Sequence, residues 1–253
     1  MSLPRRALIG LALLLAGCAP EGSSGPSAAV VLSPADGPAV PFDQPSAASA
    51  ARPDPPELPS RLPGVGERLG SAVPAGTRQV LVVSGDGPDA STGQAVLYRD
   101  DGDGWLAGPT WPTRNALRGW TADHRRNDLR SPIGVFTLSD AGGLLPDPGS
   151  RLPYSRSDDF AVSGTGFEGE PLEGSFDYVI AIDYNRVPGS TPLDPRRPLG
   201  DRYGSGIWLH VDHGGPTHGC VSMSADRMRE LLLALDPALR PVVVMGDAGT
   251  LAR

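Results

Sequence analysis

One cysteine and one histidine stand at a spacing that suits nucleophilic catalysis. The string Thr217-His218-Gly219-Cys220 places the cysteine ten residues after His210, which lies in the apolar, strand-like run 207–211. A thiol becomes a strong nucleophile when a base within hydrogen-bond reach takes its proton. A histidine held rigidly on a strand provides such a base. These residue types predict Cys220 as a nucleophile and His210 as its base.

The same segment also offers donor atoms for a metal site, which gives an alternative interpretation. A zinc hydrolase would use four candidate ligands that fall within eleven residues: His210, His213, His218 and Cys220. Two observations count against it. Strand alternation separates His210 from His213, and the spacing matches no common zinc pattern. We therefore expect neither a metal nor another cofactor.

The segments around these residues resemble the active-site signature of the L,D-transpeptidase family, also called the YkuD family. That signature is a histidine, a spacer, and then Ser/Thr-His-Gly-Cys followed by an apolar residue and Asn or Arg. Here the last two positions are Val221 and Ser222, so Ser222 departs from the usual residue, and the spacer is shorter than in the best-studied members. The run 131–136 is similar to the family's TPxGxF strand, and the resemblance continues through 176–178 and 183–185.

The resemblance implies a cysteine acyltransferase that acts on peptidoglycan stem peptides. The thiolate attacks an amide carbonyl, expels a D-amino acid and leaves a thioester, which an amine resolves in transfer or water resolves in a carboxypeptidase side reaction. A glycine before the nucleophile lets main-chain N–H groups converge on the developing oxyanion. The residues expected to hold the oxyanion or the substrate, beside the catalytic pair Cys220 and His210, are Gly219, His218, Ser222, Asn185 and Arg130.

A third group should fix the tautomer of His210, as in other pairs of nucleophile and base. Asp212 lies two positions further along the predicted strand, about 6 to 7 Å away and too far for a direct hydrogen bond. A backbone carbonyl is therefore the better candidate.

A non-catalytic cell-wall-binding module of the same fold is a further alternative, because Ser222 departs from the pattern. A decayed catalytic site would be expected to lose Cys220 or His210 first, and the chain has both.

Short apolar runs predict a mainly β catalytic domain over residues 77–247. The runs are rich in β-branched and aromatic residues and are separated by Gly, Pro and Asp clusters, as in a β-sandwich or barrel. Strands are expected at 79–83, 95–99, 134–138, 176–184, 206–212 and 241–245. In the run 206–212, alternation turns Trp208, His210 and Asp212 toward a cleft and buries the opposite face.

One helix is expected directly after the nucleophile. Ser224 can cap it, and its apolar stripe consists of Met228, Leu231, Leu232 and Leu235. That spacing is typical of a helix that packs one face on a core. Asp236-Pro237 ends it, because a residue before proline disfavours the helical conformation.

Two long stretches, 100–130 and 145–173, are rich in Gly, Asp and Pro and are expected to be loops. Loops of this length in a compact domain commonly act as lids or substrate walls. Three tryptophans fall in the first stretch: Trp105, Trp111 and Trp120. Burial in the core is the favoured interpretation for them, over the lining of a cleft.

Residues 1–17 have the composition of an export signal. Two arginines precede the apolar run 7–16, which is shorter than the about 20 residues that a membrane helix needs. The run ends at Leu15-Ala16-Gly17-Cys18, similar to the bacterial lipobox, in which the cysteine becomes the lipidated N-terminus. We expect Cys18 to anchor an exported protein at the outer face of the cytoplasmic membrane, at the cell wall. Residues 18–76 would form a flexible tether and 248–253 a tail.

The charge of the chain limits its partners. The formal net charge is -7, and removal of residues 1–17 takes away two arginines and no acids, which gives -9. An acidic protein is a poor match for nucleic acid or for an anionic membrane surface, so the lipid would supply the membrane attachment. Lipidation of Cys18 would leave Cys220 unpaired in an oxidising compartment, where an odd thiol is expected to be reactive. The sequence gives no indication of oligomeric state.

Overall fold

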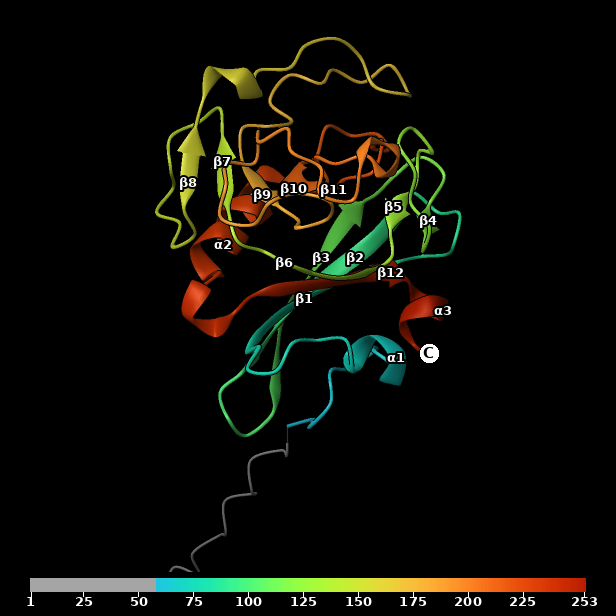
Figure 1. Cartoon of the computed structure of the whole chain (residues 1–253), viewed down its shortest axis with the longest axis vertical. Coiled ribbons are helices and arrows are strands. Elements are labelled where there is room, and N and C mark those ends of the chain that lie inside the picture. Colours follow the sequence, from blue (N-terminus) through green and yellow to red (C-terminus); the bar gives the residue numbers. More distant parts are fainter. Residues whose placement is uncertain (1–57) are drawn as a thin grey trace, which may run out of the picture. The chain divides into compact units, whose positions relative to one another are not determined.

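The computed structural model describes residues 58–253, so the expected export signal, the lipidation site Cys18 and most of the tether lie outside the described residues. Strands dominate the described part (Figure 1). The strands are β1 (Gln79–Gly85), β2 (Thr92–Asp100), β3 (Trp105–Arg114), β4 (Trp120–Thr121), β5 (Ser131–Pro132), β6 (Gly134–Thr137), β7 (Ala141–Gly143), β8 (Tyr154–Arg156), β9 (Val179–Ala181), β10 (Trp208–Val211), β11 (Val221–Met223) and β12 (Val242–Asp247). The helices are α1 (Glu67–Gly70), α2 (Ala225–Ala234) and α3 (Ala248–Leu251), with 3-10 turns η1 (Asp158–Phe160), η2 (Asp201–Tyr203) and η3 (Pro237–Leu239).

Ten of the strands form one curled mixed sheet, and β4 pairs with β5 in a second, two-stranded one. The order in the large sheet is β6-β12-β1-β2-β3-β11-β10-β9-β7-β8. β1 runs parallel to β12, and β10 runs parallel to β11. Both β1 and β12 are buried along nearly their whole length, which explains why their sequences are continuous apolar runs without alternation. The expectation of a mainly β domain is confirmed.

Helix α2 packs its apolar stripe into the larger of two hydrophobic clusters. Met228, Leu231 and Leu232 are fully buried there, and each buried leucine contributes roughly 1.5 to 3 kcal/mol to folding. The helix begins after Ser224 and ends before Leu235, where the backbone becomes extended. Among residues 58–253 it is the one helix of seven or more residues, as the sequence predicts.

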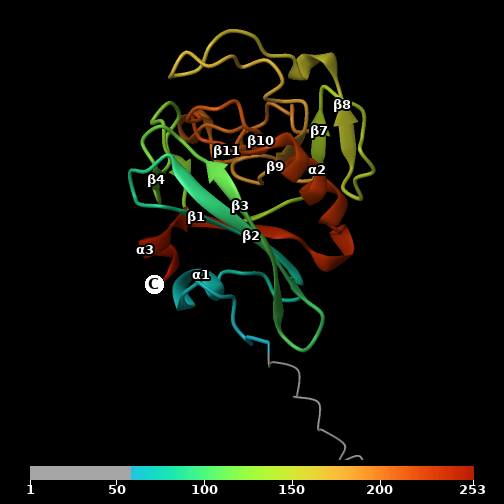
Figure 2. The same ribbon diagram turned by 180° about the vertical axis from the view of Figure 1, so that it is seen from behind.

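A second cluster covers the opposite face of β1 and β12, and the two short helices belong to it. Leu62, Leu69 and Leu251 are buried against Val80 and its neighbours. The main-chain N–H of Gly66 donates to the carbonyl of Leu251 at 2.7 Å, which joins α1 to α3 (Figure 2). Residues 62–69 and 248–251, on either side of the expected domain 77–247, thus pack on the same sheet as its strands. Three scattered leucines give no periodic signal, so their burial was not predicted.

The prediction that residues 100–130 form a loop is wrong for the first half of this stretch, because β3 occupies 105–114. The strand pairs with β2 and β11, yet residues 106–110 are exposed, so it lacks the alternation that marks a half-buried strand. Two prolines within the strand, Pro109 and Pro112, also argued against a strand prediction, since proline is uncommon within a sheet. Trp111 and Trp120 are buried, which confirms the core interpretation for those two tryptophans.

None of the helices formed by residues 58–253 combines the length and the apolar character that a membrane crossing requires.

Candidate active site

Cys220 lies one residue before β11, beside the start of the parallel strand β10. Its sulfur accepts a hydrogen bond from the main-chain N–H of Trp208 at 3.4 Å and lies 3.4 Å from the carbonyl of Gly206. It is the free cysteine of the described residues and is partly buried. Burial raises the pKa of the Cys220 thiol to about 11, and the N–H of Trp208 opposes this only weakly. The resting nucleophile is therefore a neutral thiol at pH 7.

His210 is held in the middle of β10 and is 3% exposed. Its Nδ1 lies 2.8 Å from the carbonyl of Val211. A carbonyl can only accept, so Nδ1 carries the proton and Nε2 keeps its lone pair, which is the tautomer that a base needs. Burial lowers the pKa of His210 to about 4, so the ring is neutral at pH 7.

A backbone carbonyl thus orients the imidazole, and Asp212 has other partners. Its carboxylate accepts hydrogen bonds from Ser222 Oγ at 3.2 Å and from the N–H of Gly214 at 3.1 Å, and it lies 3.5 Å from the guanidinium of Arg114.

Two hydroxyl groups fix the main chain at the nucleophile. Thr217 Oγ1 and Ser131 Oγ both donate to the carbonyl of Cys220, at 2.7 and 3.3 Å. The main-chain N–H groups of Gly219 and Cys220 donate to no acceptor within residues 58–253, so they are available to an oxyanion. A Cβ at Gly219 would meet Ile207 Cδ1 at 2.9 Å, so a larger residue beside the cysteine would have to displace the end of that side chain. The sequence pattern gave no reason to expect Ser131 or Thr217 in this arrangement.

Cys220 and His210 line the same cavity, of about 400 Å³. The strands explain the arrangement: His210 pairs with Ser222 across β10 and β11, and Cys220, two residues before Ser222, reaches the cavity from just before the start of β11. Within residues 58–253 no hydrogen bond joins the His210 ring to the Cys220 sulfur, so the cavity that both residues line is what brings them together. The remaining walls are largely apolar and include Trp208, Phe176 and Phe167.

Of the other residues expected at the site, one lies beside Cys220 and three do not line the cavity. His218 is exposed beside Cys220, and its ring lies 4.6 Å from that of Phe167. Ser222 is fully buried, donates to Asp212 and is not among the residues that line the cavity. Asn185 is buried, with 5% of its surface exposed. Its side-chain amide makes hydrogen bonds to the main chain of the loop 199–204, as turn-stabilising asparagines do. Arg130 pairs with Asp89 at 2.9 Å. The last three residues therefore do not line the cavity at the nucleophile.

The separation of His210 and His213 that strand alternation predicted is wrong. The chain turns after Val211, and the His213 ring stacks on the His210 ring with centroids 5.8 Å apart and planes 7° apart. His213 Nδ1 also lies 3.2 Å from a carboxylate oxygen of Glu170, although the two atoms are not aligned as a hydrogen bond. Glu170 was not predicted at the site, because forty residues separate it from His210 and no pattern links them.

The proposed zinc ligands do not form a metal site. Within the part of the chain that the structure describes, no three His, Cys, Asp or Glu side chains converge as metal ligands. His210 directs Nδ1 to a carbonyl, and His218 packs on Phe167. The residues present therefore do not fit the zinc hydrolase interpretation.

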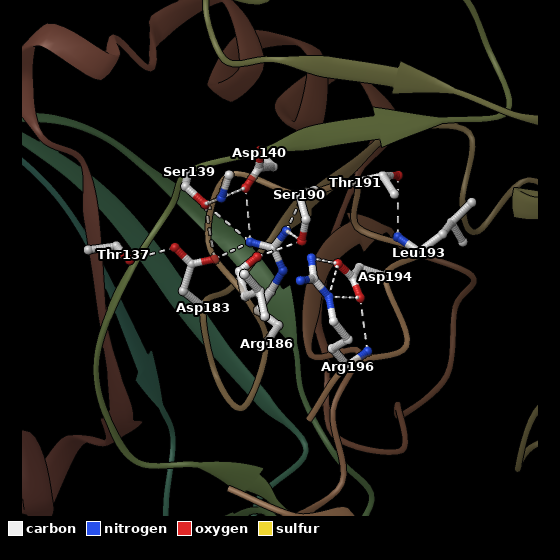
Figure 3. A network of polar contacts seen from close by, with 12 residues as sticks. Thr137, Ser139, Asp140, Asp183, Arg186, Ser190, Thr191, Leu193, Asp194 and Arg196 are labelled. Atoms are coloured by element: carbon white, nitrogen blue, oxygen red, sulfur yellow. Dashed lines mark hydrogen bonds and ion pairs between the residues drawn. The ribbon is translucent and has the colours of Figure 1, made fainter. Parts of the chain in front are cut away.

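A buried ionic network holds the long loop that leads to β10. The Arg186 guanidinium lies 3.0 Å from Asp140 and also pairs with Asp183, and each of these side chains is 3% to 4% exposed (Figure 3). Arg186 donates further to the carbonyl of Ser190. The loop continues to Gly206, whose carbonyl contacts the Cys220 sulfur. The network thus fixes one end of the segment that meets the nucleophile.

Comparison with known proteins adds a family match. The family model described as the L,D-transpeptidase catalytic domain, YkuD, matches residues 76–244, which contain every residue of the site described above. No curated protein matches the chain. Among solved structures, Bd1075 of Bdellovibrio bacteriovorus shares 17% sequence identity, with a TM-score of 0.39. That match covers 75% of this chain and 53% of the Bd1075 chain, and its TM-score is too low to define the fold.

Proposed function

Because the chain belongs to the L,D-transpeptidase catalytic domain family, we propose that it forms peptide cross-links in peptidoglycan through a thioester on Cys220. The observation that carries this proposal is the shared cavity of Cys220 and His210, with His210 held in the tautomer of a base by the Val211 carbonyl. The family implies stem peptides of peptidoglycan as substrates.

The reaction follows from the two neutral side chains. His210 Nε2 takes the thiol proton while the sulfur of Cys220 attacks the amide carbonyl, and the negative charge moves to the carbonyl oxygen. The free N–H groups of Gly219 and Cys220 are the donors for that oxygen. Collapse breaks the C–N bond, and the His210 imidazolium returns its proton to the leaving amine. An incoming amine then gives its proton to His210, attacks the thioester and releases the thiol.

Defined stem peptides test this proposal. We expect the protein to convert a tetrapeptide stem into a cross-linked product when an amine is added and to release the terminal D-amino acid into water when it is not. Mass spectrometry detects both products and the thioester on Cys220. Cys220→Ala should abolish turnover, and His210→Gln should lower it by about 10² to 10⁴. Unchanged stems with every amine, and no adduct on Cys220, would refute the proposal.

We further propose that the protein is exported and held at the outer face of the cytoplasmic membrane by lipid on Cys18. The support is the sequence alone: an arginine-led apolar run that ends at Leu15-Ala16-Gly17-Cys18. Cells fed an alkyne-labelled fatty acid should label the wild-type protein, and the label should disappear in Cys18→Ser with release of the protein from the membrane fraction. A wild-type protein without label, or a labelled Cys18→Ser, would contradict the anchor.

A further inference from the structure

The sulfur of Cys220 lies where two cavities meet. The first is the largely apolar cavity of about 400 Å³ that contains His210. The second, of about 280 Å³, shares only Gly206, His218 and Cys220 with it. The second cavity is otherwise lined by Gly219 and by residues of the loops 124–127 and 197–207, and His210 is not among them.

The four groups bonded to the attacked carbonyl carbon determine which part of the substrate each cavity holds. The tetrahedral intermediate carries the sulfur, the oxyanion, the leaving amine and the acyl chain. The leaving amine must face His210, since His210 returns its proton, and the incoming amine must occupy the same place to be deprotonated. Both amines therefore use the apolar cavity. The acyl chain points away from His210, and the second cavity is the space beside the sulfur that can receive it.

The second cavity is cationic although the chain has a net charge of -7. Its wall contains the guanidinium groups of Arg126 and Arg197. Arg197 is held by Ser205 Oγ and by Asp201, each at 2.8 Å. Arg126 is exposed, and within residues 58–253 its side chain makes neither an ion pair nor a hydrogen bond. Arg126 thus has no direct carboxylate partner in this cavity, although its charge contributes, after that of Arg197, to lowering the pKa of the Asp201 carboxyl.

The neighbouring cations of these two loops already have partners. Arg125 pairs with Asp123 at 2.7 Å, and the Arg202 guanidinium lies over the Tyr203 ring, 4.5 Å from its centroid. His124, which also lines the cavity, is buried, and burial lowers its pKa, so it is mainly neutral at pH 7. Arg126 is therefore the arginine of this wall that makes no direct ion pair or hydrogen bond within residues 58–253.

The loop that carries Arg126 is built to hold one conformation. Asn127 and Leu129 have φ values of 65° and 60°, in the left-handed region that residues other than glycine rarely adopt. Asp128 accepts the main-chain N–H groups of Arg125 and Arg130 at 2.7 and 2.9 Å, and the N–H of Arg126 donates to the carbonyl of Arg202. Strained backbone that surrounding contacts maintain is typical of functional loops.

We propose that Arg126, with Arg197 beside it, is a specificity-determining residue that binds a carboxylate on the acyl side of the donor peptide. This inference rests on the proposed transpeptidase function and adds the part of the substrate that the enzyme selects. Arginine suits the task because its planar guanidinium binds a carboxylate through two parallel hydrogen bonds.

A stem peptide offers two carboxylates on that side, and selective amidation separates them. One is the α-carboxylate of the glutamate that is linked through its γ-carboxyl group, and the other belongs to the side chain of a diamino-dicarboxylic third residue. Four tetrapeptide stems are compared: the free acid, each singly amidated form and the doubly amidated form. For the wild type we expect kcat/KM to fall about 10- to 100-fold when the recognised carboxylate becomes an amide, the range for one charge-assisted hydrogen bond.

The matched protein variants are Arg126→Gln, Arg197→Gln and Arg229→Gln. Arg126→Gln should lower kcat/KM for the free acid by the same factor, mainly through KM, and should treat acid and amide stems alike. Arg126→Lys should recover part of the discrimination. Arg229 is exposed on α2 and unpaired within the described residues, so Arg229→Gln is the control for the loss of one positive charge.

Equal wild-type rates on all four stems would overturn the inference while leaving the transpeptidase function intact. It would also be overturned if Arg126→Gln slowed acid and amide stems equally, because that pattern indicates a structural contribution. A wild-type protein that turned over none of the stems would remove both this inference and the proposed function.

Discussion

Two uncharged side chains set the chemistry of this site at the residue scale. Burial moves the pKa of His210 to about 4 and that of Cys220 to about 11, so neither is ionised between those values. The sequence suggested a thiolate formed in advance by its base. The structure favours a thiol that loses its proton only as it attacks, because the low-polarity surroundings disfavour both charged forms.

Alkylation of the purified protein with iodoacetamide measures this directly. Only the thiolate reacts, so Cys220 should be modified about 100-fold more slowly at pH 7 than a cysteine with an ordinary pKa of 9. The rate should rise by a factor of ten per pH unit through pH 9.5 without levelling off. A plateau below pH 8 would show a stabilised thiolate and contradict the neutral pair. Cys220→Ala controls for modification elsewhere.

At the scale of elements, the loop 161–174 forms one wall of the apolar cavity, and we call it the wall loop. It folds back on itself through the bridge between Thr165 and Pro171. Phe167 at its tip packs on His218, and Glu170 inserts its carboxylate beside His213. The main-chain N–H groups of Glu170 itself and of Glu168 lower the pKa of the Glu170 carboxyl, so it stays charged. The wall loop therefore packs on two histidines that line the cavity, His213 and His218.

The space for the Glu170 carboxylate depends on Gly215. A Cβ at this position would lie 1.9 Å from Glu170 Oε1, so Gly215→Ala must displace the carboxylate from its place beside His213. We expect the wall loop to detach, with faster hydrogen exchange in 161–174 and about a tenfold loss of kcat/KM, mainly through KM, since a packed wall of the binding cavity is lost.

Two further variants make this prediction specific. Glu170→Ala combined with Gly215→Ala should behave no worse than Glu170→Ala alone, because the clash is then absent. A Cβ at Gly70 meets no atom within 4 Å, so Gly70→Ala is the neutral control. If Gly215→Ala left the exchange of 161–174 unchanged, the proposed attachment of the wall loop would be wrong.

For the whole molecule, a buried arginine joins segments that are distant along the chain. Arg186 pairs with Asp140, 46 residues earlier, and with Asp183, and Ser139 Oγ lies within the same network (Figure 3). Buried carboxylates without a partner are strongly unfavourable, because the interior does not replace their hydration.

Removal of this arginine should therefore destabilise the fold. We expect Arg186→Gln to lower the free energy of unfolding by about 3 to 5 kcal/mol, measured by denaturant titration. The control is Arg227→Gln, which breaks the exposed pair of Arg227 with Glu230 on α2 and should change stability by less than about 1 kcal/mol. Equal effects of the two substitutions would show that the network contributes no more than a surface pair.

Stability should also fall in weak acid because of the buried histidines. The unfolded chain protonates His210 near pH 6.5, whereas the folded protein resists this until about pH 4. The unfolded state thus binds more protons in this window, and the free energy of unfolding decreases as the pH falls from 6.5 to 4. His210 alone accounts for about 3 kcal/mol at pH 4, and burial lowers the pKa of His124 in the same direction.

Comparison with His210→Gln isolates this contribution from the carboxylates, which also titrate in acid. The wild type should lose stability more steeply than the variant between pH 6.5 and 4.5, and the two should run parallel above pH 7. Parallel curves over the whole range would mean that His210 binds its proton as readily in the folded protein as in the unfolded chain.

The sequence determined the local features of this protein. Apolar runs predicted β1, β2, β6, β10 and β12, and the spacing of Met228, Leu231 and Leu232 predicted α2. The short motif from Thr217 to Cys220 and the histidine before it identified the pair that shares a cavity. These signals are readable because strand alternation, helical periodicity and turn residues act over a few neighbouring positions.

Only the tertiary structure decided what surrounds that pair. It brought His213 to the wall of the first cavity with Glu170 beside it, and it brought Arg126 and Arg197 to the second, while Ser222 and Asn185 line neither. It also added β3 and the packing of Leu62 and Leu251 to the domain. These contacts join residues tens of positions apart, and they depend on how the sheet curls and where the loops pack, which no local periodicity in the chain encodes.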